Sequence, residues 1–203
     1  MSNVEFLKAA HEQMALEDRV VIANSGPNYE LFMAAPWLDM IGAGEGYSSE
    51  LHHHSIVRAI AAQKPCSFWG ERTEAAIKEC MLMGIYPGFG DGSNYESYRS
   101  LYQQYMPILD TLDDAGWEPI TAAKSSNTNV CVERHGPDDN GVIYLVARAP
   151  SRRSSADITV YSDDLGWPAH PDVTVTELLY GGAVSTSYDG DGNLVISTGT
   201  IGR

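Results

Sequence analysis

The chain has little positive charge, few cysteines and no long apolar run. Its 13 lysine and arginine residues stand against 27 acidic residues, which gives the 203-residue chain a formal net charge of −14. A protein that binds nucleic acid or an anionic membrane needs a basic surface, so we expect neither kind of partner. No apolar run approaches the roughly 20 residues of a membrane-spanning helix.

The amino-terminal residues and the cysteines together indicate a compartment. A basic segment followed by an apolar one is missing at the start, so we expect no signal peptide. Cys66, Cys80 and Cys131 are odd in number and lack CxxC spacing. The simplest interpretation is free thiols in a reducing environment, which predicts a cytoplasmic protein.

The first part of the chain alternates short buried-strand patterns with helical patterns. We expect strands within 19–24, 38–42, 65–69 and 84–89, and helices within 5–16, 29–35, 48–63, 73–83 and 95–115. Buried strands that are separated by helices predict a parallel sheet with right-handed crossovers.

The second part contains strand patterns and turn residues only. We expect strands within 130–133, 142–146, 158–161, 173–179 and 194–196, with a hairpin turn at 188–193. The change of pattern predicts two domains, residues 1–122 and 123–203, of which the second is a small antiparallel β-sandwich.

Familiar sequence motifs are missing, so the candidate site rests on position. Functional groups of parallel α/β folds gather at the carboxyl ends of the strands. We assign catalytic roles to Asp39 and Glu45. The expected substrate-binding residues at these ends are Asn24, Trp69, Glu71 and Asp91. Asp39 lies inside an apolar run, where a carboxylate is costly unless it is paired or used; its alternative role is a cap or a salt-bridge partner.

Three consecutive histidines, His52, His53 and His54, form the second candidate site. Imidazoles bind zinc and similar divalent ions well, so these residues are candidate metal ligands. Consecutive residues of a helix point about 100° apart, so all three cannot bind one ion from a regular helix. Their alternative role is that of surface and packing residues at a helix start.

Several segments together resemble one family of enzymes. The segments are Lys64-Pro65 before a strand, residues 81–89, Gly116-Trp117-Glu118-Pro119, and the strand patterns at 130–136 and 142–148. They resemble the last part of the (β/α)8 barrel of α-galactosidase-like glycoside hydrolases, followed by the carboxy-terminal β-sandwich of these enzymes. The resemblance implies a fold of about four strand-helix units, a half barrel of the TIM type, before the sandwich.

The length of the chain departs from this family. A full barrel needs about 250 residues, whereas the barrel-like part here has about 115. Glycosidases of this kind use two carboxylates that flank the scissile bond, and the strand that carries one of them in the family has no counterpart here. The open strand edges of a half barrel invite association, so we expect a homodimer that completes the barrel-like core.

Three functions remain open at this point. The first is a hydrolase derived from a glycosidase barrel, with Asp39 and Glu45 in a dimeric cleft. The second is a zinc-dependent hydrolase of phosphate or carboxyl esters, in which the histidine cluster holds the metal and the bound water attacks. The third is a non-catalytic carbohydrate-binding fragment. Each of them takes a small-molecule ligand, a sugar or an ester.

Overall fold

The computed structural model describes residues 2–24, 29–43, 51–69, 73–88, 95–182 and 184–202, without the side chains of residues 23, 24, 29–31, 43, 51–54, 69 and 95. The chain divides into two compact units, Met1–Asp113 and Asp114–Arg203. Within the described ranges, no helix is both long and apolar enough to cross a membrane.

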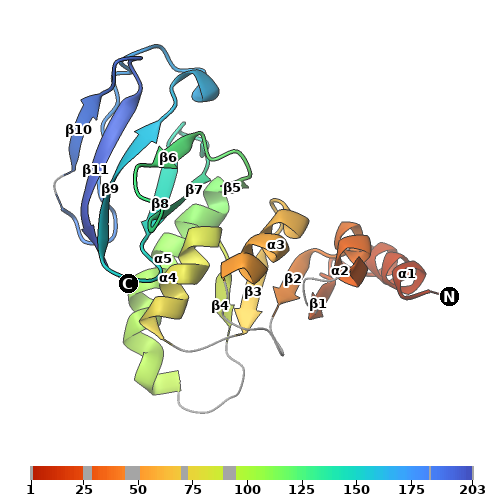
Figure 1. The fold of residues 1–203 in the computed structure, drawn as a ribbon. Coiled ribbons are helices and arrows are strands. Elements are labelled where there is room, and N and C mark those ends of the chain that lie inside the picture. The colour runs from red at the N-terminus through yellow and green to blue at the C-terminus, as the bar shows by residue number, and fades with distance from the viewer. Residues whose placement is uncertain are drawn as a thin grey trace. The chain divides into compact units, whose positions relative to one another are not determined.

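Unit 1 is built of helices and short parallel strands (Figure 1). In chain order its elements are α1 (Asn3–Ala15), β1 (Ile22–Asn24), α2 (Tyr29–Ala34), η1 (Ala35–Trp37), β2 (Met40–Ala43), α3 (Leu51–Ala61), β3 (Cys66–Trp69), α4 (Glu74–Met83), β4 (Tyr86–Gly88), η2 (Tyr95–Tyr98) and α5 (Arg99–Ala115). Helix α5 extends two residues past the division between the units.

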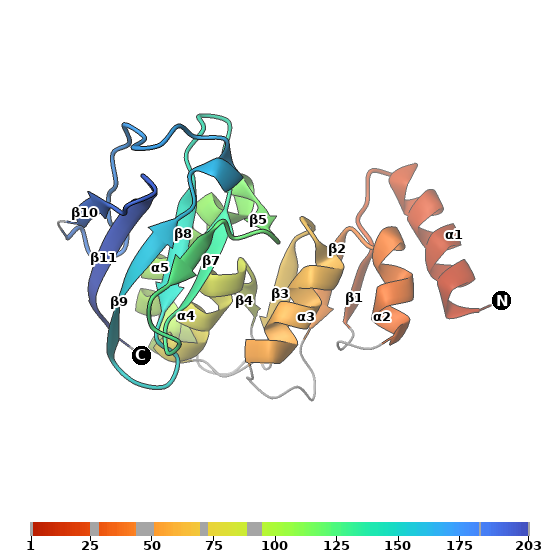
Figure 2. The same cartoon turned by 45° about the horizontal axis from the view of Figure 1, so that its top comes forward.

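The four strands of unit 1 pair in the order β1-β2-β3-β4, and every pair is parallel. Sequential parallel neighbours need a crossover connection each time, and the helices between the strands supply it; α2 and α3 lie along the same side of the sheet (Figure 2). Ile41, Cys66 and Phe68 point to the covered face, where each is at most 3% exposed. Ile22, on the opposite face, is 55% exposed. The parallel pairing agrees with the strand-helix alternation of the sequence.

Local sequence explains where two of the helices begin and end. Ser2 and Glu5 form a capping box, in which each side chain accepts a hydrogen bond from the other residue's backbone, and this starts α1. Thr73 caps the start of α4 by accepting a hydrogen bond from the backbone of Ala76. Gly84 ends α4 with a φ of 59°, a left-handed conformation that favours glycine.

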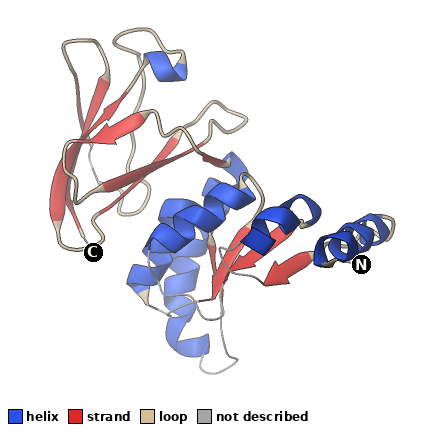
Figure 3. Ribbon diagram, turned by 45° about the vertical axis from the view of Figure 1, so that its right-hand side comes forward, coloured by secondary structure: helices blue, strands red, loops and turns tan. Residues whose placement is uncertain are grey.

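Unit 2 contains strands, loops and a short helical turn (Figure 3). Its elements are β5 (Trp117–Glu118), β6 (Ala123–Ser125), β7 (Cys131–His135), β8 (Tyr144–Arg148), β9 (Ser154–Val160), η3 (Asp163–Leu165), β10 (Ser185–Tyr188) and β11 (Leu194–Ile201). They form two antiparallel sheets, one ordered β10-β11-β9-β6 and the other β5-β7-β8. Ile158, Val160 and Leu194 of the first sheet share a core with Val132 and Leu145 of the second.

The predicted hairpin is confirmed as the β10–β11 pair, in which Tyr188 faces Leu194. The carboxylate of Asp189 closes the turn, because it accepts hydrogen bonds from the backbone of Asp191 and Asn193. This use of an aspartate side chain in a turn is the Asx pattern.

The predicted fold class, a TIM-type half barrel followed by a small β-sandwich, is wrong. The described residues form five short α-helices and three sheets, one parallel and two antiparallel, without a half-barrel pattern. A barrel wall needs strands that are long enough to tilt and stagger against each other. Among the described residues, each junction of the parallel sheet joins three residue pairs. We expected a second copy of the chain to complete the barrel-like core. Without a half barrel, that expectation has no structural support.

The strand expected within 173–179 is also wrong, because these residues form no strand. Glu177 organises a turn at the end of this segment, and of its three donors Leu179 lies within 173–179. Its carboxylate accepts hydrogen bonds from the backbone N–H groups of Leu179, Tyr180 and Gly182, at 2.8, 2.7 and 3.2 Å. A local turn of this kind competes with a sheet ladder for the same donors.

Candidate functional site

The parallel sheet of unit 1 has two edges at which the strands begin or end. We call the residues just before β1–β4 the amino edge, and the last residues of these strands with the segments that follow them the carboxyl edge. The strands end at Asn24, Ala43, Trp69 and Gly88. Because the strands are parallel, these four residues end at the same edge.

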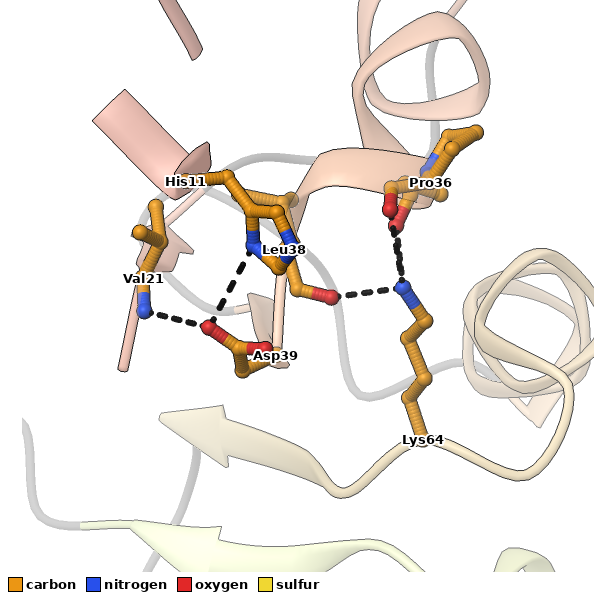
Figure 4. A network of polar contacts seen from close by, with 7 residues as sticks. His11, Val21, Pro36, Leu38, Asp39 and Lys64 are labelled. Atoms are coloured by element: carbon orange, nitrogen blue, oxygen red, sulfur yellow. Dashed lines mark hydrogen bonds and ion pairs between the residues drawn. The ribbon is translucent and has the colours of Figure 1, made fainter. Parts of the chain in front are cut away.

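Asp39 lies at the amino edge, because β2 begins at Met40. Its backbone N–H donates to the carbonyl of Val21 at 2.9 Å, and its Oδ2 accepts from the N–H of Val21 at 2.7 Å (Figure 4). The side chain therefore connects the residues that precede β1 and β2. The expected position of Asp39 at a carboxyl strand end is wrong, and the alternative role as a cap or ion-pair partner matches these contacts.

His11 of α1 is the other side chain at Asp39. Its Nδ1 lies 3.6 Å from Oδ2 of Asp39, and its ring stands edge-on to that of Trp37, with centroids 6.4 Å apart. The sequence predicts no role for His11. Helix positions carry no signal for a partner that is 28 residues away in the chain.

Lys64 connects β3 to the segment before β2. Its Nζ donates to the carbonyls of Ala35 at 2.7 Å and Leu38 at 2.6 Å, with a longer contact of 3.4 Å to Pro36 (Figure 4). A cation near the end of a helical turn is favourable because the carbonyl oxygens there carry partial negative charge; the carbonyl of Ala35 also accepts from the N–H of Leu38 at 3.3 Å. Lys64 thus uses its charge to hold the end of η1 against the start of β3.

Arg58 of α3 makes the third connection. The side chain is 2% exposed, and its Nη1 donates to the carbonyl of Gly84, just before β4, at 3.1 Å. Its Nη2 donates to the carbonyls of Ala62 and Lys64. Arg58 therefore links the segments that lead into β3 and β4. Asp39, Lys64 and Arg58 together connect the starts of all four strands.

Two further ionisable groups near the amino edge are kept in their neutral forms. Burial, which outweighs the nearby Arg58, raises the pKa of the Cys66 thiol to about 11. Burial raises the pKa of Tyr86, and so do Asp113 and Asp110, whose carboxylates accept hydrogen bonds from its hydroxyl at 3.4 and 3.1 Å. A thiol and a phenol that stay protonated at neutral pH are poor nucleophiles.

The other predicted site residues belong to the carboxyl edge or follow it in the sequence. Asn24 ends β1 and pairs with Gly42, and Trp69 ends β3 and pairs with Gly88. Glu45, Glu71 and Asp91 lie outside the described residues. The structure therefore brings Asn24 and Trp69 to one edge and separates Asp39 from them.

His52, His53 and His54 belong to the first turn of α3, and their side chains are outside the description. Among the side chains that the structure does describe, no group of three His, Cys, Asp or Glu residues is placed to hold a metal ion. The predicted zinc ligands therefore stay a prediction.

Comparison of the chain with models of protein families, with curated proteins and with solved structures finds no match.

Proposed function

We propose that the chain is a hydrolase whose active site lies at the carboxyl edge of the parallel sheet and whose substrate is a small glycoside. The difference between the two edges of the sheet supports this proposal, because the charged side chains of the amino edge are used in structural contacts. Asp39, Lys64 and Arg58 at the amino edge use their hydrogen bonds to join strand starts. In open parallel sheets, ligands bind outside the carboxyl ends of the strands.

The resemblance of the sequence to α-galactosidase-like glycoside hydrolases supplies the substrate class. In this proposal Glu45, two residues after β2 in the sequence, acts as general acid or base. A second carboxylate is needed at the same edge, and Glu71 and Asp91, which follow β3 and β4 in the sequence, are the candidates. Asn24 and Trp69 are proposed to contact the sugar, because polar side chains and aromatic rings suit its hydroxyl groups and its apolar face.

The second candidate function is a metal-dependent hydrolase of phosphate or carboxyl esters. The observation in its favour is the start of α3 at Leu51, eight residues after β2 ends at Ala43, which brings His52–His54 close in sequence to the carboxyl edge. Neutral imidazoles hold zinc, and a zinc-bound water loses a proton near pH 7 and attacks an ester.

A substrate screen combined with metal analysis tests the proposal. We expect turnover of a nitrophenyl glycoside in a panel that also contains nitrophenyl acetate and nitrophenyl phosphate, with no loss after chelation. Ester or phosphate turnover that disappears on chelation, together with stoichiometric zinc in the purified protein, would support the second candidate instead. Sugar binding without any turnover would identify a carbohydrate-binding fragment and overturn both enzymatic assignments.

Self-association and a cytoplasmic location complete the proposal. Phe6, Leu16, Val20 and Ile22 are between 55% and 81% exposed, and β1 is an end strand in the described part of the sheet. Exposed apolar side chains beside an unpaired strand edge favour association, so we expect a homodimer in light scattering at micromolar concentration; a monomer would contradict it. The three cysteines are free, which supports a reducing compartment.

A further inference from the structure

The connection between β8 and β9 in unit 2 ends in three exposed residues. It runs from Ala149 to Arg153, and residues 151–153 are exposed. In the described part of the chain, these three residues take part in no backbone–backbone hydrogen bond. The carbonyl of Arg152 accepts a bond of 3.3 Å from the hydroxyl of Ser154. Exposed connections whose backbone is held by few hydrogen bonds are the preferred sites of proteolytic nicking.

The strand on the amino side of this connection is paired on one side. β8 is an end strand of the described sheet and pairs with β7. β9 pairs with β11 from Ser154 onward and with β6 at residues 158–160, and Asn127 also donates to the carbonyl of Ser155 at 2.9 Å. A protease cleaves a chain that has opened locally around the bond. Opening toward β8 breaks the bonds of one ladder, whereas opening along β9 breaks more.

The two arginines of the connection differ from the other basic residues that the structure describes. Those other residues lie in helices or strands, except Arg19 and Lys64. Arg19 pairs with Glu17 at 3.3 Å, and Lys64 donates to backbone carbonyls. Within the described ranges, Arg152 and Arg153 are therefore the basic residues that are exposed, outside helices and strands, and free of ion pairs.

We propose that the Arg152–Arg153 pair is a site of limited proteolysis for a protease that cleaves after arginine, and that the cut chain stays together. Such a protease binds the guanidinium in a pocket that contains a carboxylate, to which the planar side chain donates two hydrogen bonds. It adds one water across the peptide bond, which leaves a carboxylate on the arginine and an amino group on the residue that follows. The site is independent of the proposed hydrolase activity.

The fold of unit 2 holds the two resulting fragments to each other. β9, β10 and β11 all follow the cut, and they are neighbours in one sheet. Ile158, Val160 and Leu194 of these strands share a core with Val132 and Leu145, which precede the cut. β9 also pairs with β6, which precedes the cut as well. We therefore expect cleavage to produce one particle that contains two chains.

Treatment of the native full chain with a small amount of trypsin, followed over time by intact mass spectrometry, tests the proposal. We expect the first products to end at Arg152 or Arg153 and to begin at the next residue. In size-exclusion chromatography, the two products are expected to elute together in buffer and separately in urea. The double variant Arg152→Gln/Arg153→Gln is expected to lose this cut.

Arg19→Gln is the matched control. It removes the same charge from an arginine that is 67% exposed but paired with Glu17, and this variant is expected to be cut at the Arg152–Arg153 pair as fast as the wild type. A first cut of the wild type at any other residue would overturn the proposal, and so would an unchanged cut in the double variant. Products that separate in buffer would overturn the inference that the cut chain stays together.

Discussion

Replacement of Glu45 by glutamine is expected to lower the rate of glycoside hydrolysis by about a thousandfold. Glutamine has nearly the same shape as glutamate but neither gives nor takes a proton in this pH range. A positioned general acid or base contributes about 10²- to 10⁴-fold to a rate. The loss is expected in kcat more than in KM, because the proton transfer occurs in the transition state and not in the binding of the substrate.

Glu12→Gln provides the matched control for Glu45→Gln. Glu12 is an exposed residue of α1, 3.9 Å from Lys8, so the same chemical change there is expected to leave kcat within about twofold of wild type, as for an exposed surface substitution. Measurement of kcat and KM for the best substrate of the screen compares both variants with the wild type. Full activity of Glu45→Gln would remove Glu45 from the mechanism, and equal losses in both variants would indicate an unspecific effect.

The sequence predicted the elements of unit 1 better than their assembly. Short apolar runs such as the one at Cys66–Trp69 have the length and composition of buried strands, and the structure contains β3 there. The periodicity of apolar residues indicates which strands are buried. Buried strands that are separated by helices in turn indicate parallel pairing. Periodicity carries no information about the curvature of a sheet, which depends on tilt and register between strands that are distant in sequence. This is why the prediction of a half barrel was wrong.

The position of Asp39 was missed for a more local reason. The apolar residues Trp37 and Leu38 before it suggested that the strand had already begun, but Pro36 and Trp37 belong to η1. Leu38 is fully buried at the end of that turn and not within the strand. An apolar run of this length does not distinguish a buried strand from a buried helical turn that leads into one.

No pattern in the sequence predicts the contacts of the amino edge. Lys64 and Arg58 donate mostly to backbone carbonyls, and every residue has a carbonyl, so no complementary side chain marks the partner. Charged residues are usually exposed, and nothing in the sequence around Arg58 indicates that it is buried. Contacts of this kind are visible only when the fold has brought the strand starts together.

Replacement of Arg58 by alanine is expected to lower the free energy of unfolding by about 3–4 kcal/mol. A buried acceptor that loses its donor costs about 1–3 kcal/mol; Arg58 donates to the buried carbonyl of Gly84 and to the part-buried carbonyls of Ala62 and Lys64. The side chain is 2% exposed, so its removal also leaves a cavity. Arg58→Lys is expected to lose less, because its ammonium keeps the charge but cannot reproduce the planar fork of donors.

Urea unfolding followed by circular dichroism measures these differences, with Arg153→Ala as the control. Arg153 is exposed, so its replacement is expected to change the stability by less than about 0.5 kcal/mol. The slope of the transition shows whether the variants still unfold in one step. If Arg58→Ala stays within about 1 kcal/mol of the wild type, the connections of the amino edge are not what holds the strand starts together. The reason for assigning structure to that edge and chemistry to the carboxyl edge would then be lost as well.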